Sequence, residues 1–261
     1  MDDKIRIDML LVEKRLLPSR ARAQSAIEMG LVKVNGKTVK KASEKFDEFC
    51  EIDLLGQPYK YVSRAGEKLD KALCNFDISV LGKVCLDVGA STGGFTHCML
   101  EHGAREIYAV DVGTSQLDLS LLANKKVRSF ENCDIRTFQP DTEFDFISVD
   151  VSFISLKNIK DAISRLSVEK TQIVMLVKPQ FECGGVGISK KGVVSDKKVH
   201  CKILKDVIGC YQAEGFSICG LDYSPIRGGE GNIEFLLYIS KSGQDIVPDI
   251  DRIVEVAHKL G

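Results

Sequence analysis

The chain has 261 residues, of which 44% are apolar and 28% charged, and its formal net charge is −1. This composition is typical of a globular protein with a full core, and the length allows one large domain with a small companion. No segment approaches the ~18 consecutive apolar residues that a membrane-spanning helix needs. The charged N-terminal stretch MDDKIRIDMLLVEKRLL is not typical of a secretory signal. We therefore expect a cytoplasmic protein rather than a secreted or membrane-inserted one.

The cysteine pattern points to the same compartment. None of the nine cysteines forms a C-x-x-C pair, and the four histidines form no ligand cluster with them. Several lie in apolar runs, such as Cys85 in KVCLDVG and Cys219 in FSICGL, where a reduced thiol behaves as a small hydrophobic side chain. This spacing predicts reduced cysteines and no metal site.

The first part of the chain is strongly basic. Between Lys4 and Lys45 there are eleven lysines and arginines against four acidic residues, a net charge of +7, so the rest of the chain is acidic. A basic module on an acidic body indicates nucleic-acid binding by the module. The alternative is a charged face that only water contacts.

Two short helices and a hairpin are expected in this basic part. Ile7, Leu10 and Leu11 recur at helical spacing, and a second helix should run from Arg20 to about Met29, with Ser19 as its N-cap and Gly30 as its stop. The stretch LVKV-NG-KTVK then carries the Asn-Gly signal of a type I′ hairpin.

The stretch SRARAQSAIEMGLVKVNGKTV resembles the RNA-binding domain named after ribosomal protein S-four, and the resemblance covers about residues 5–58. It implies binding to RNA by shape and phosphate contact, with the larger part of the chain left for chemistry. The basic residues that we expect to contact RNA are Arg6, Arg20, Arg22, Lys37 and Lys41, together with Arg64 in the bridge that follows.

After a bridge with Pro58, a helix is expected from about Ser63, with Leu69 and Leu73 on its apolar face. From Lys83 onward strands and helices alternate, which predicts a mostly parallel α/β sheet. The seven candidate strands are KVCLDVG, EIYAVDVG, VRSFENC, FDFISVDVS, QIVMLVKP, FSICGLDYSP and NIEFLLYISK, and IDRIVEVAHKL should form a terminal helix. Since the last two strands have no helix between them, they predict an antiparallel pair, as in a class I Rossmann-like methyltransferase. The expected domains are residues 1–59 and 65–261, with a linker at 60–64.

The first strand of the sheet ends in the glycine-rich loop LDVGASTGGFTHCML. Small residues between a strand and a helix let the backbone approach a cofactor closely. The loop lacks the second glycine of G-x-G-x-x-G, which suits S-adenosylmethionine better than the pyrophosphate of NAD, although the loop alone does not decide between them. The loop residues that we expect to bind the cofactor are Asp87, Gly89, Ala90, Ser91, Gly93, Gly94 and Phe95.

Acidic residues follow two neighbouring strands. Asp111 follows the second strand, 22 residues after Gly89, where a carboxylate typically accepts the ribose hydroxyls. Asp134 follows the third strand and is positioned to accept the amine of an adenine. Both are expected at the crevice at the carboxyl ends of the strands.

Four further residues are unusual for their places in the pattern. Asp150 and Lys178 directly follow long apolar strands, Glu234 interrupts an apolar strand, and Lys68 lies on the helix that enters the domain. Each has a plain alternative: Lys68 as a solvated helix residue, Glu234 as an edge-strand carboxylate, and Lys178 as a cap at a strand end.

The stretches YVSRAGEKL, LDVGASTGGF, AVDVG-TSQL, VDVSFISL, VKPQFE, KKGVV and GNIEFLLY resemble the TlyA (haemolysin A-like) family of ribosomal RNA methyltransferases, which are similar to FtsJ-type 2′-O-methyltransferases. The resemblance covers nearly the whole chain. It implies methyl transfer from S-adenosylmethionine to the ribose 2′-hydroxyl of a cytidine in 23S ribosomal RNA within ribosomal subunits, and in some members of one in 16S ribosomal RNA. It also implies that Lys68, Asp150, Lys178 and Glu234 form the family's catalytic tetrad.

The chemistry agrees with these residue types. A ribose hydroxyl is a poor nucleophile at neutral pH and needs a base at the moment of attack. A lysine, with a reference pKa of ~10.4, becomes a base only where burial or neighbouring positive charge favours its neutral form. We expect Lys178 to be the base, Asp150 to orient it, and Lys68 and Glu234 to position the reacting groups.

Two other classes of function compete with this hypothesis. A pore-forming haemolysin, which the family's name suggests, would need a secretion signal and a membrane-active segment, and the sequence shows neither. A non-catalytic ribosome-binding factor would not need the intact glycine loop and the complete set of four residues.

Overall fold

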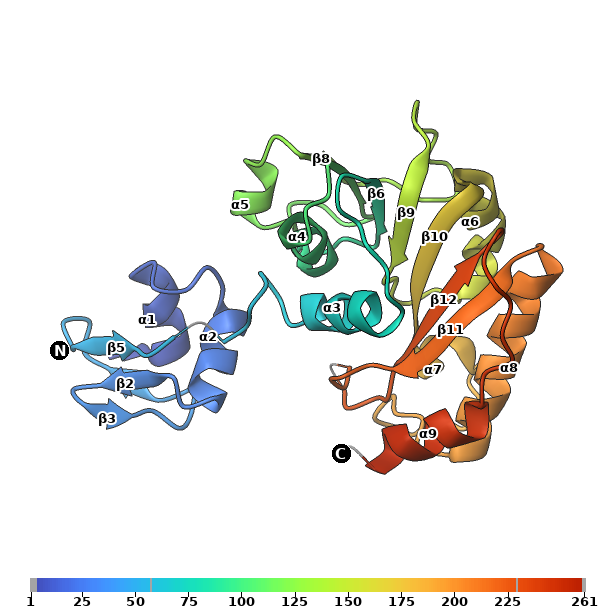
Figure 1. The fold of residues 1–261 in the computed structure, drawn as a ribbon. Coiled ribbons are helices and arrows are strands. Elements are labelled where there is room, and N and C mark those ends of the chain that lie inside the picture. The colour runs from blue at the N-terminus through green and yellow to red at the C-terminus, as the bar shows by residue number, and fades with distance from the viewer. Residues whose placement is uncertain (1–3, 57, 229, 260–261) are drawn as a thin grey trace. The chain divides into compact units, whose positions relative to one another are not determined.

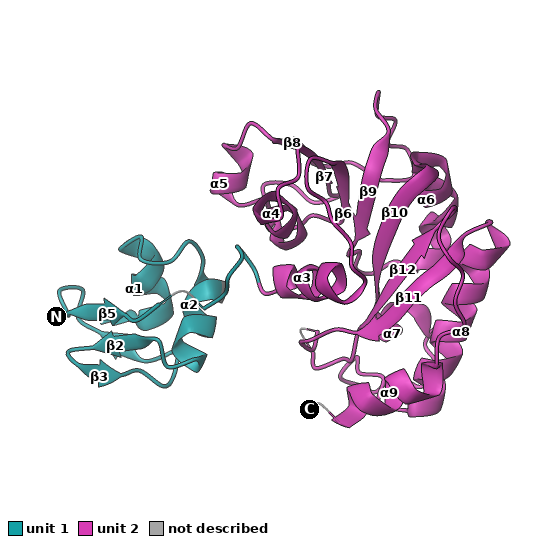
Figure 2. Cartoon of the chain, in the orientation of Figure 1, with its two compact units in different colours: residues 1–63 teal, residues 64–261 magenta. Residues whose placement is uncertain are grey.

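The computed structural model describes residues 4–56, 58–228 and 230–259. Contacts within the chain divide it into two compact units, residues 1–63 and residues 64–261 (Figure 2). The functional division drawn from the sequence, 1–59 and 65–261 around a linker at 60–64, stays a prediction.

The first unit is a small α/β fold. Its elements are β1 (Ile5–Arg6), α1 (Ile7–Glu13), α2 (Arg20–Glu28), β2 (Val32–Val34), β3 (Lys37–Thr38), β4 (Lys45–Phe46) and β5 (Ile52–Leu54). β2 pairs with both β3 and β5, and β1 pairs with β4, in each case antiparallel. The buried faces of α1 and α2 pack together with Val32 and Val34 to form this unit's core.

The local signals in the first unit act as predicted. Ser19 Oγ accepts a hydrogen bond from the backbone N–H of Arg22 at 3.3 Å, which caps α2. Asn35 and Gly36 have φ values of 49° and 77°, the two positive values that a type I′ turn between β2 and β3 requires. Gly30, at φ 71°, ends the turn after α2.

The second unit is a seven-stranded sheet with helices on both faces (Figure 1). Its elements are α3 (Ala65–Asn75), β6 (Val84–Val88), α4 (Gly94–Glu101), β7 (Glu106–Val110), α5 (Leu119–Leu122), β8 (Val127–Phe130), β9 (Phe144–Val149), the 3-10 helix η1 (Leu156–Ile159), α6 (Lys160–Leu166), β10 (Ser167–Val177), α7 (Pro179–Glu182), α8 (Lys197–Ala213), β11 (Ser217–Tyr223), β12 (Phe235–Ser240) and α9 (Ile250–Lys259). Residue 260 of the predicted terminal helix lies outside the described residues.

The sheet order is β11-β12-β10-β9-β6-β7-β8. β12 runs antiparallel to β10 and β11, while the pairs from β10 to β8 are parallel. This is the class I methyltransferase arrangement that the sequence predicts. The order reverses between β6 and β9, and such a switch point opens a crevice at the carboxyl ends of the strands.

The structure differs from the predicted elements in three places. β10 begins at Ser167, earlier than the apolar run suggests, and its register against β9 shifts between Ser167 and Gln172. β12 begins at Phe235, so Glu234 precedes the strand instead of interrupting it. The fully described connection between β8 and β9 contains no helix. In the described part of the chain, no helix is long and apolar enough to cross a membrane.

Candidate active site

Lys178 and Asp150 form an ion pair at the ends of two neighbouring parallel strands. Since β9 ends at Val149 and β10 at Val177, both side chains start from the same edge of the sheet. Lys178 Nζ lies 2.6 Å from Asp150 Oδ1 and donates a hydrogen bond to Ser152 Oγ at 2.9 Å. The two partners fix the direction of a lysine amine that is largely buried.

Lys68 and Glu234 form a second ion pair. Lys68 Nζ on α3 lies 2.6 Å from Glu234 Oε2, and the two side chains are only 9% and 3% exposed. The structure therefore excludes the plain alternatives for both residues, because neither the lysine nor the carboxylate is solvated.

The strand register brings these two pairs together. Phe235 lies opposite Val177 in the antiparallel β10–β12 ladder. Glu234 and Lys178 are each one residue beyond that pair, so they are cross-strand neighbours at the carboxyl edge of the sheet. Lys68, Asp150, Lys178 and Glu234 (the tetrad) thus meet from α3 and three strand ends.

Gly89 lets the glycine loop approach the end of β9. Its φ is 83°, and a Cβ on it would lie 2.6 Å from the backbone oxygen of Asp150. Only glycine satisfies both the positive φ and the close approach. Asp150 N donates a hydrogen bond to Val88 O at 2.9 Å. This bond fixes the position of Asp150 relative to the end of β6, where the glycine loop begins.

A cavity of about 530 Å³ opens beside the tetrad at the ends of β6, β7, β8 and β9. Four of the residues predicted to bind the cofactor, together with Asp150, line it: Gly89, Ser91, Asp111 and Asp134. A cavity of this size is typical for a nucleoside-sized ligand.

The two acidic residues of the cavity have different surroundings. Asp111 accepts hydrogen bonds from the backbone N–H groups of Ser91, at 2.8 Å, and Gly113, at 2.7 Å, which hold the carboxylate at the end of β7. Asp134 is paired with Arg136, whose guanidinium hydrogen bonds lower the pKa of that carboxyl. A ligand amine at Asp134 therefore shares the carboxylate with Arg136 or displaces it.

The remaining predicted loop residues do not line this cavity: Asp87, Ala90, Gly93, Gly94 and Phe95. Gly93 has φ 92°, and the space for a Cβ is taken by Leu117 and Leu121. Its glycine is needed for packing and backbone conformation, so a larger residue there would disturb the fold before it reached a cofactor.

Asp87 is fully buried beneath the loop. Its carboxylate accepts hydrogen bonds from Thr96 Oγ1 at 2.6 Å and Ser148 Oγ at 3.1 Å. Burial raises the pKa of Asp87 to about 7, and these hydrogen bonds oppose the shift. Asp87 thus joins the loop helix α4 to β9.

Glu182 was missed by the sequence reasoning. Its buried carboxylate accepts from Ser155 Oγ at 2.6 Å and from Leu156 N at 2.7 Å. It ties the VKPQFE segment to the VDVSFISL segment. The signal was the acidic end of VKPQFE, but its partner could not be read from the sequence.

Phe153 is an exposed aromatic residue at the cavity. It is 92% exposed at φ 64°, and its ring centroid lies 5.1 Å from that of Phe181. A non-glycine residue at positive φ is uncommon, and an exposed ring beside a cavity suits stacking on a nucleic-acid base.

The predicted RNA-binding residues of the first unit fall into two groups. Lys37 and Lys41 are exposed. Arg6 and Arg20 instead pair with Asp8, a fully buried carboxylate that also accepts from Gln24 at 3.0 Å, and these donors hold the pKa of Asp8 well below its usual range.

The other two arginines differ from each other. Arg22 is half-buried and donates to Val62 O at 3.1 Å. Arg64 is exposed at the start of α3 in the second unit. Arg6, Arg20 and Arg22 therefore support the fold, whatever else they contact.

Among the described residues, one group has the composition of a metal site: Asp70 on α3, Cys98 on α4 and His102 directly after α4. His102 Nε2 lies 2.7 Å from Asp70 Oδ1, and no tetrad residue belongs to the group. The expectation of metal-free chemistry stays a prediction.

Two family models match the chain. The FtsJ-like methyltransferase model matches residues 61–241, and the S4 domain model matches residues 5–49. The chain belongs to the FtsJ-like methyltransferase family. It is an enzyme that carries an N-terminal S4 domain, as the resemblance implies.

Similar proteins span both units. YqxC of Bacillus subtilis is 44% identical over 98% of this chain and 95% of the relative. The 23S rRNA (cytidine-2′-O)-methyltransferase TlyA of Campylobacter jejuni is 39% identical, with 88% and 98% covered. A solved haemolysin-named structure from Streptococcus thermophilus has a TM-score of 0.79 and 43% identity, covering 100% of this chain and 98% of that one.

Proposed function

We propose that this enzyme transfers a methyl group from S-adenosylmethionine to the ribose 2′-hydroxyl of a cytidine in 23S ribosomal RNA, with 16S ribosomal RNA as a second substrate to be tested. The observation that carries the proposal is the pair of buried ion pairs, Lys178–Asp150 and Lys68–Glu234, at the carboxyl edge of the sheet, where Asp150 lines the cavity. The 39% sequence identity with the Campylobacter jejuni 23S rRNA (cytidine-2′-O)-methyltransferase supports a cytidine of 23S ribosomal RNA as the substrate.

The cavity residues suit S-adenosylmethionine. Asp111 is held where it can accept ribose hydroxyls, and Asp134 can accept an adenine amine. Gly89 allows a ligand to approach the backbone, and the lack of a second loop glycine disfavours a pyrophosphate. When bound, the cofactor supplies an electrophilic methyl group on a sulfonium.

In the proposed mechanism one residue of the tetrad accepts a proton and the other three position the reacting groups. The amine of Lys178 would accept the proton of the 2′-hydroxyl after its own ammonium proton has passed to solvent. S-adenosylmethionine, held by Asp111 and Asp134, would supply the methyl group to the ribose oxygen. Asp150 and Ser152 aim that amine. Lys68 and Glu234 neutralise each other's charge, and their ion pair fixes both side chains so that they can position the ribose. In-line alignment supplies much of the acceleration.

The first unit, residues 1–63, which contains the S4 domain and is called the S4 unit below, provides affinity for RNA in this proposal. Its exposed Lys37 and Lys41 suit phosphate contacts, which give register without reading bases. The substrate is RNA within ribosomal subunits, which places the enzyme in the cytoplasm. A non-catalytic role is disfavoured because the tetrad is complete.

The test is to map 2′-O-methylation across 23S and 16S ribosomal RNA from cells with the gene, without it, and with Lys178→Ala. We expect one or two cytidines to lose the modification in the deletion, and the wild-type gene but not the variant to restore it. Identical maps in all three strains would refute the proposal. Membrane leakage caused by purified protein and unaffected by Lys178→Ala would favour the haemolysin instead.

A further inference from the structure

Six exposed lysines that the tetrad does not use follow α7 in the chain. Lys190 and Lys191 lie in a tight turn that Ser189 closes, since Gly192 N donates to Ser189 O at 2.9 Å. Lys197, Lys198, Lys202 and Lys205 lie on α8. Asp196 is the single acidic residue between Cys183 and Lys205, and its side chain caps α8.

The turn with Lys190 and Lys191 is anchored to the catalytic edge. Asn232, only 1% exposed, accepts a hydrogen bond from Val194 N at 3.0 Å and donates to Gly192 O at 2.9 Å. Asn232 lies two residues before Glu234. The lysine turn is therefore held by the same segment that delivers a tetrad carboxylate.

α8 begins at this edge as well. The chain leaves β10 at its carboxyl end, passes through α7, and follows α8 back to the start of β11 at the opposite edge. The start of α8 thus lies at the same edge of the sheet as the end of β10 (Figure 1). Lys197 and Lys198 are in the first turn of α8, and Lys178 directly follows β10.

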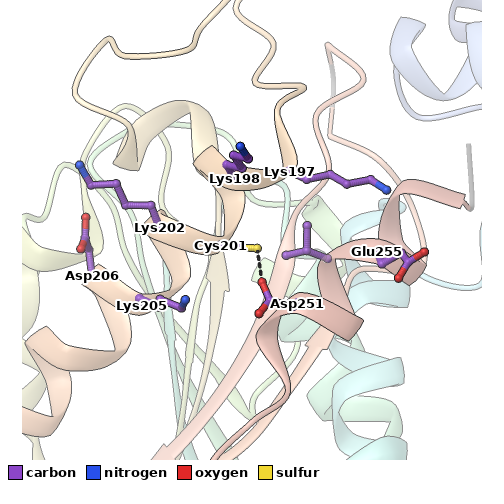
Figure 3. A pocket seen from close by; sticks show the side chains of 9 residues that line it. Lys197, Lys198, Cys201, Lys202, Lys205, Asp206, Asp251 and Glu255 are labelled. Atoms are coloured by element: carbon purple, nitrogen blue, oxygen red, sulfur yellow. Dashed lines mark hydrogen bonds between the residues drawn. The ribbon is translucent and has the colours of Figure 1, made fainter.

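The α8 lysines surround a groove of about 540 Å³ between α8 and α9 (Figure 3). Cys201 Sγ donates to Asp251 Oδ1 at 3.2 Å within it, and Asp206 and Glu255 also line it. Three acidic side chains make the groove a poor site for a single small anion. The four lysines that line it lie apart along α8 and suit an extended chain of phosphates, because each ammonium is a point charge that contacts one phosphate.

We propose that Lys190, Lys191, Lys197 and Lys198 (the lysine edge) bind the phosphates of the RNA strand that carries the target ribose. The inference rests on the proposed function, since the strand must pass the tetrad. Such contacts hold the target nucleotide through its neighbours and read no base. The methyltransferase unit thereby has its own RNA contacts, separate from those of the S4 unit.

The test is steady-state methylation of large ribosomal subunits, isolated from cells lacking this gene, by the full-length enzyme at several KCl concentrations. Lys190→Gln/Lys191→Gln should raise the KM for subunits about tenfold and leave kcat unchanged. The slope of log(kcat/KM) against log[KCl] should become shallower by about 1.4, because ~0.7 is lost per phosphate contact on a single strand. Lys197→Gln/Lys198→Gln should act in the same direction.

Matched controls separate charge from structure. Lys190→Arg/Lys191→Arg should keep wild-type kinetics because it keeps both charges. Lys125→Gln/Lys126→Gln should also keep wild-type kinetics, because these two exposed, consecutive lysines precede β8 at the opposite edge of the sheet. Affinity for S-adenosylmethionine should be unchanged in all variants. A wild-type enzyme that does not methylate the subunits refutes the proposed function. An active wild type with unchanged KM and salt slope in the lysine-edge variants refutes this inference alone.

Discussion

Lys178 differs from Lys68 in that its partners, Asp150 and Ser152, lie on the loop that lines the cavity. We expect Lys178→Ala to lower kcat by about 10² to 10⁴ with little change in RNA affinity, because it removes a proton acceptor. Lys178→Arg should be equally inactive, since a guanidinium keeps its proton. Single-turnover methylation with separate RNA-binding measurements checks both. An active arginine variant would show that Lys178 supplies charge only.

Asp87 makes stability depend on pH. Its pKa of about 7 in the folded chain lies above the unfolded value of ~3.9, so the folded state binds the proton more tightly. Its contribution is therefore fully present below about pH 4 and is lost as the pH rises to about 7. Urea unfolding at pH 5 and pH 8 should show Asp87→Asn losing less stability than the wild type across that range. Parallel behaviour of the two proteins would contradict this assignment.

Sequence reasoning at the residue scale found positions but not partners. Lys178 and Asp150 follow long apolar strands, so their place at the crevice could be predicted. The burial of Lys68 could not, because its partner Glu234 is 166 residues away in the chain. The same limit hid the pairing of Asp8 with Arg6 and Arg20, which gives two of the predicted RNA-binding residues a structural role as well.

At the scale of elements, the glycine loop requires a residue without a side chain at Gly89, where the backbone comes close to Asp150. Two variants can separate the cost of this close approach from the cost of the positive φ. Gly89 and Gly215 have nearly equal φ values, 83° and 84°, but a Cβ has open space only at Gly215. We expect Gly215→Ala to cost about 1 kcal/mol from backbone strain and Gly89→Ala about 3 kcal/mol or more, because it also pushes against Asp150. Thermal unfolding checks the stabilities. Equal costs would show that the loop can move away from β9.

In the S4 unit, we expect different residues to bind RNA and to stabilise the fold. Lys37→Gln/Lys41→Gln should weaken RNA binding at every sequence and make the salt dependence shallower by about 1.4, with the fold intact. Asp8→Ala should instead destabilise the unit by about 2 kcal/mol, because it leaves two arginines without their buried partner. Filter binding at several salt concentrations and circular dichroism distinguish the two effects. If the lysine variant binds RNA as the wild type does, the phosphate contacts lie elsewhere on this unit.

The regular elements were largely predictable because their signals are local. Seven apolar runs mark the seven strands, and Ser19, Gly30 and Asn35-Gly36 mark the helix and hairpin limits. The early start of β10 at Ser167 was not predictable, since its first residues are polar and their pairing with β9 depends on a register shift.

For the whole molecule, the two units imply a division of labour. Residues 60–261 alone should bind S-adenosylmethionine as the full chain does, because the cavity and tetrad lie within them. They should methylate ribosomal RNA at least about tenfold less efficiently, since the S4 contacts are lost. Calorimetry and methylation assays test the two halves of this statement. Wild-type efficiency from the truncated protein would refute the division.

The position of β12 between β10 and β11 has a consequence for biosynthesis. Lys68, Asp150 and Lys178 are synthesised well before Glu234, and β12 enters the sheet after both of its neighbours have been made. Closing so long a loop carries an ordering cost, and such distant pairings form late in folding. A growing chain therefore cannot form the Lys68–Glu234 ion pair until β12 has been synthesised. If the tetrad has the proposed roles, the enzyme becomes active only after translation has passed Glu234 and β12 has entered the sheet.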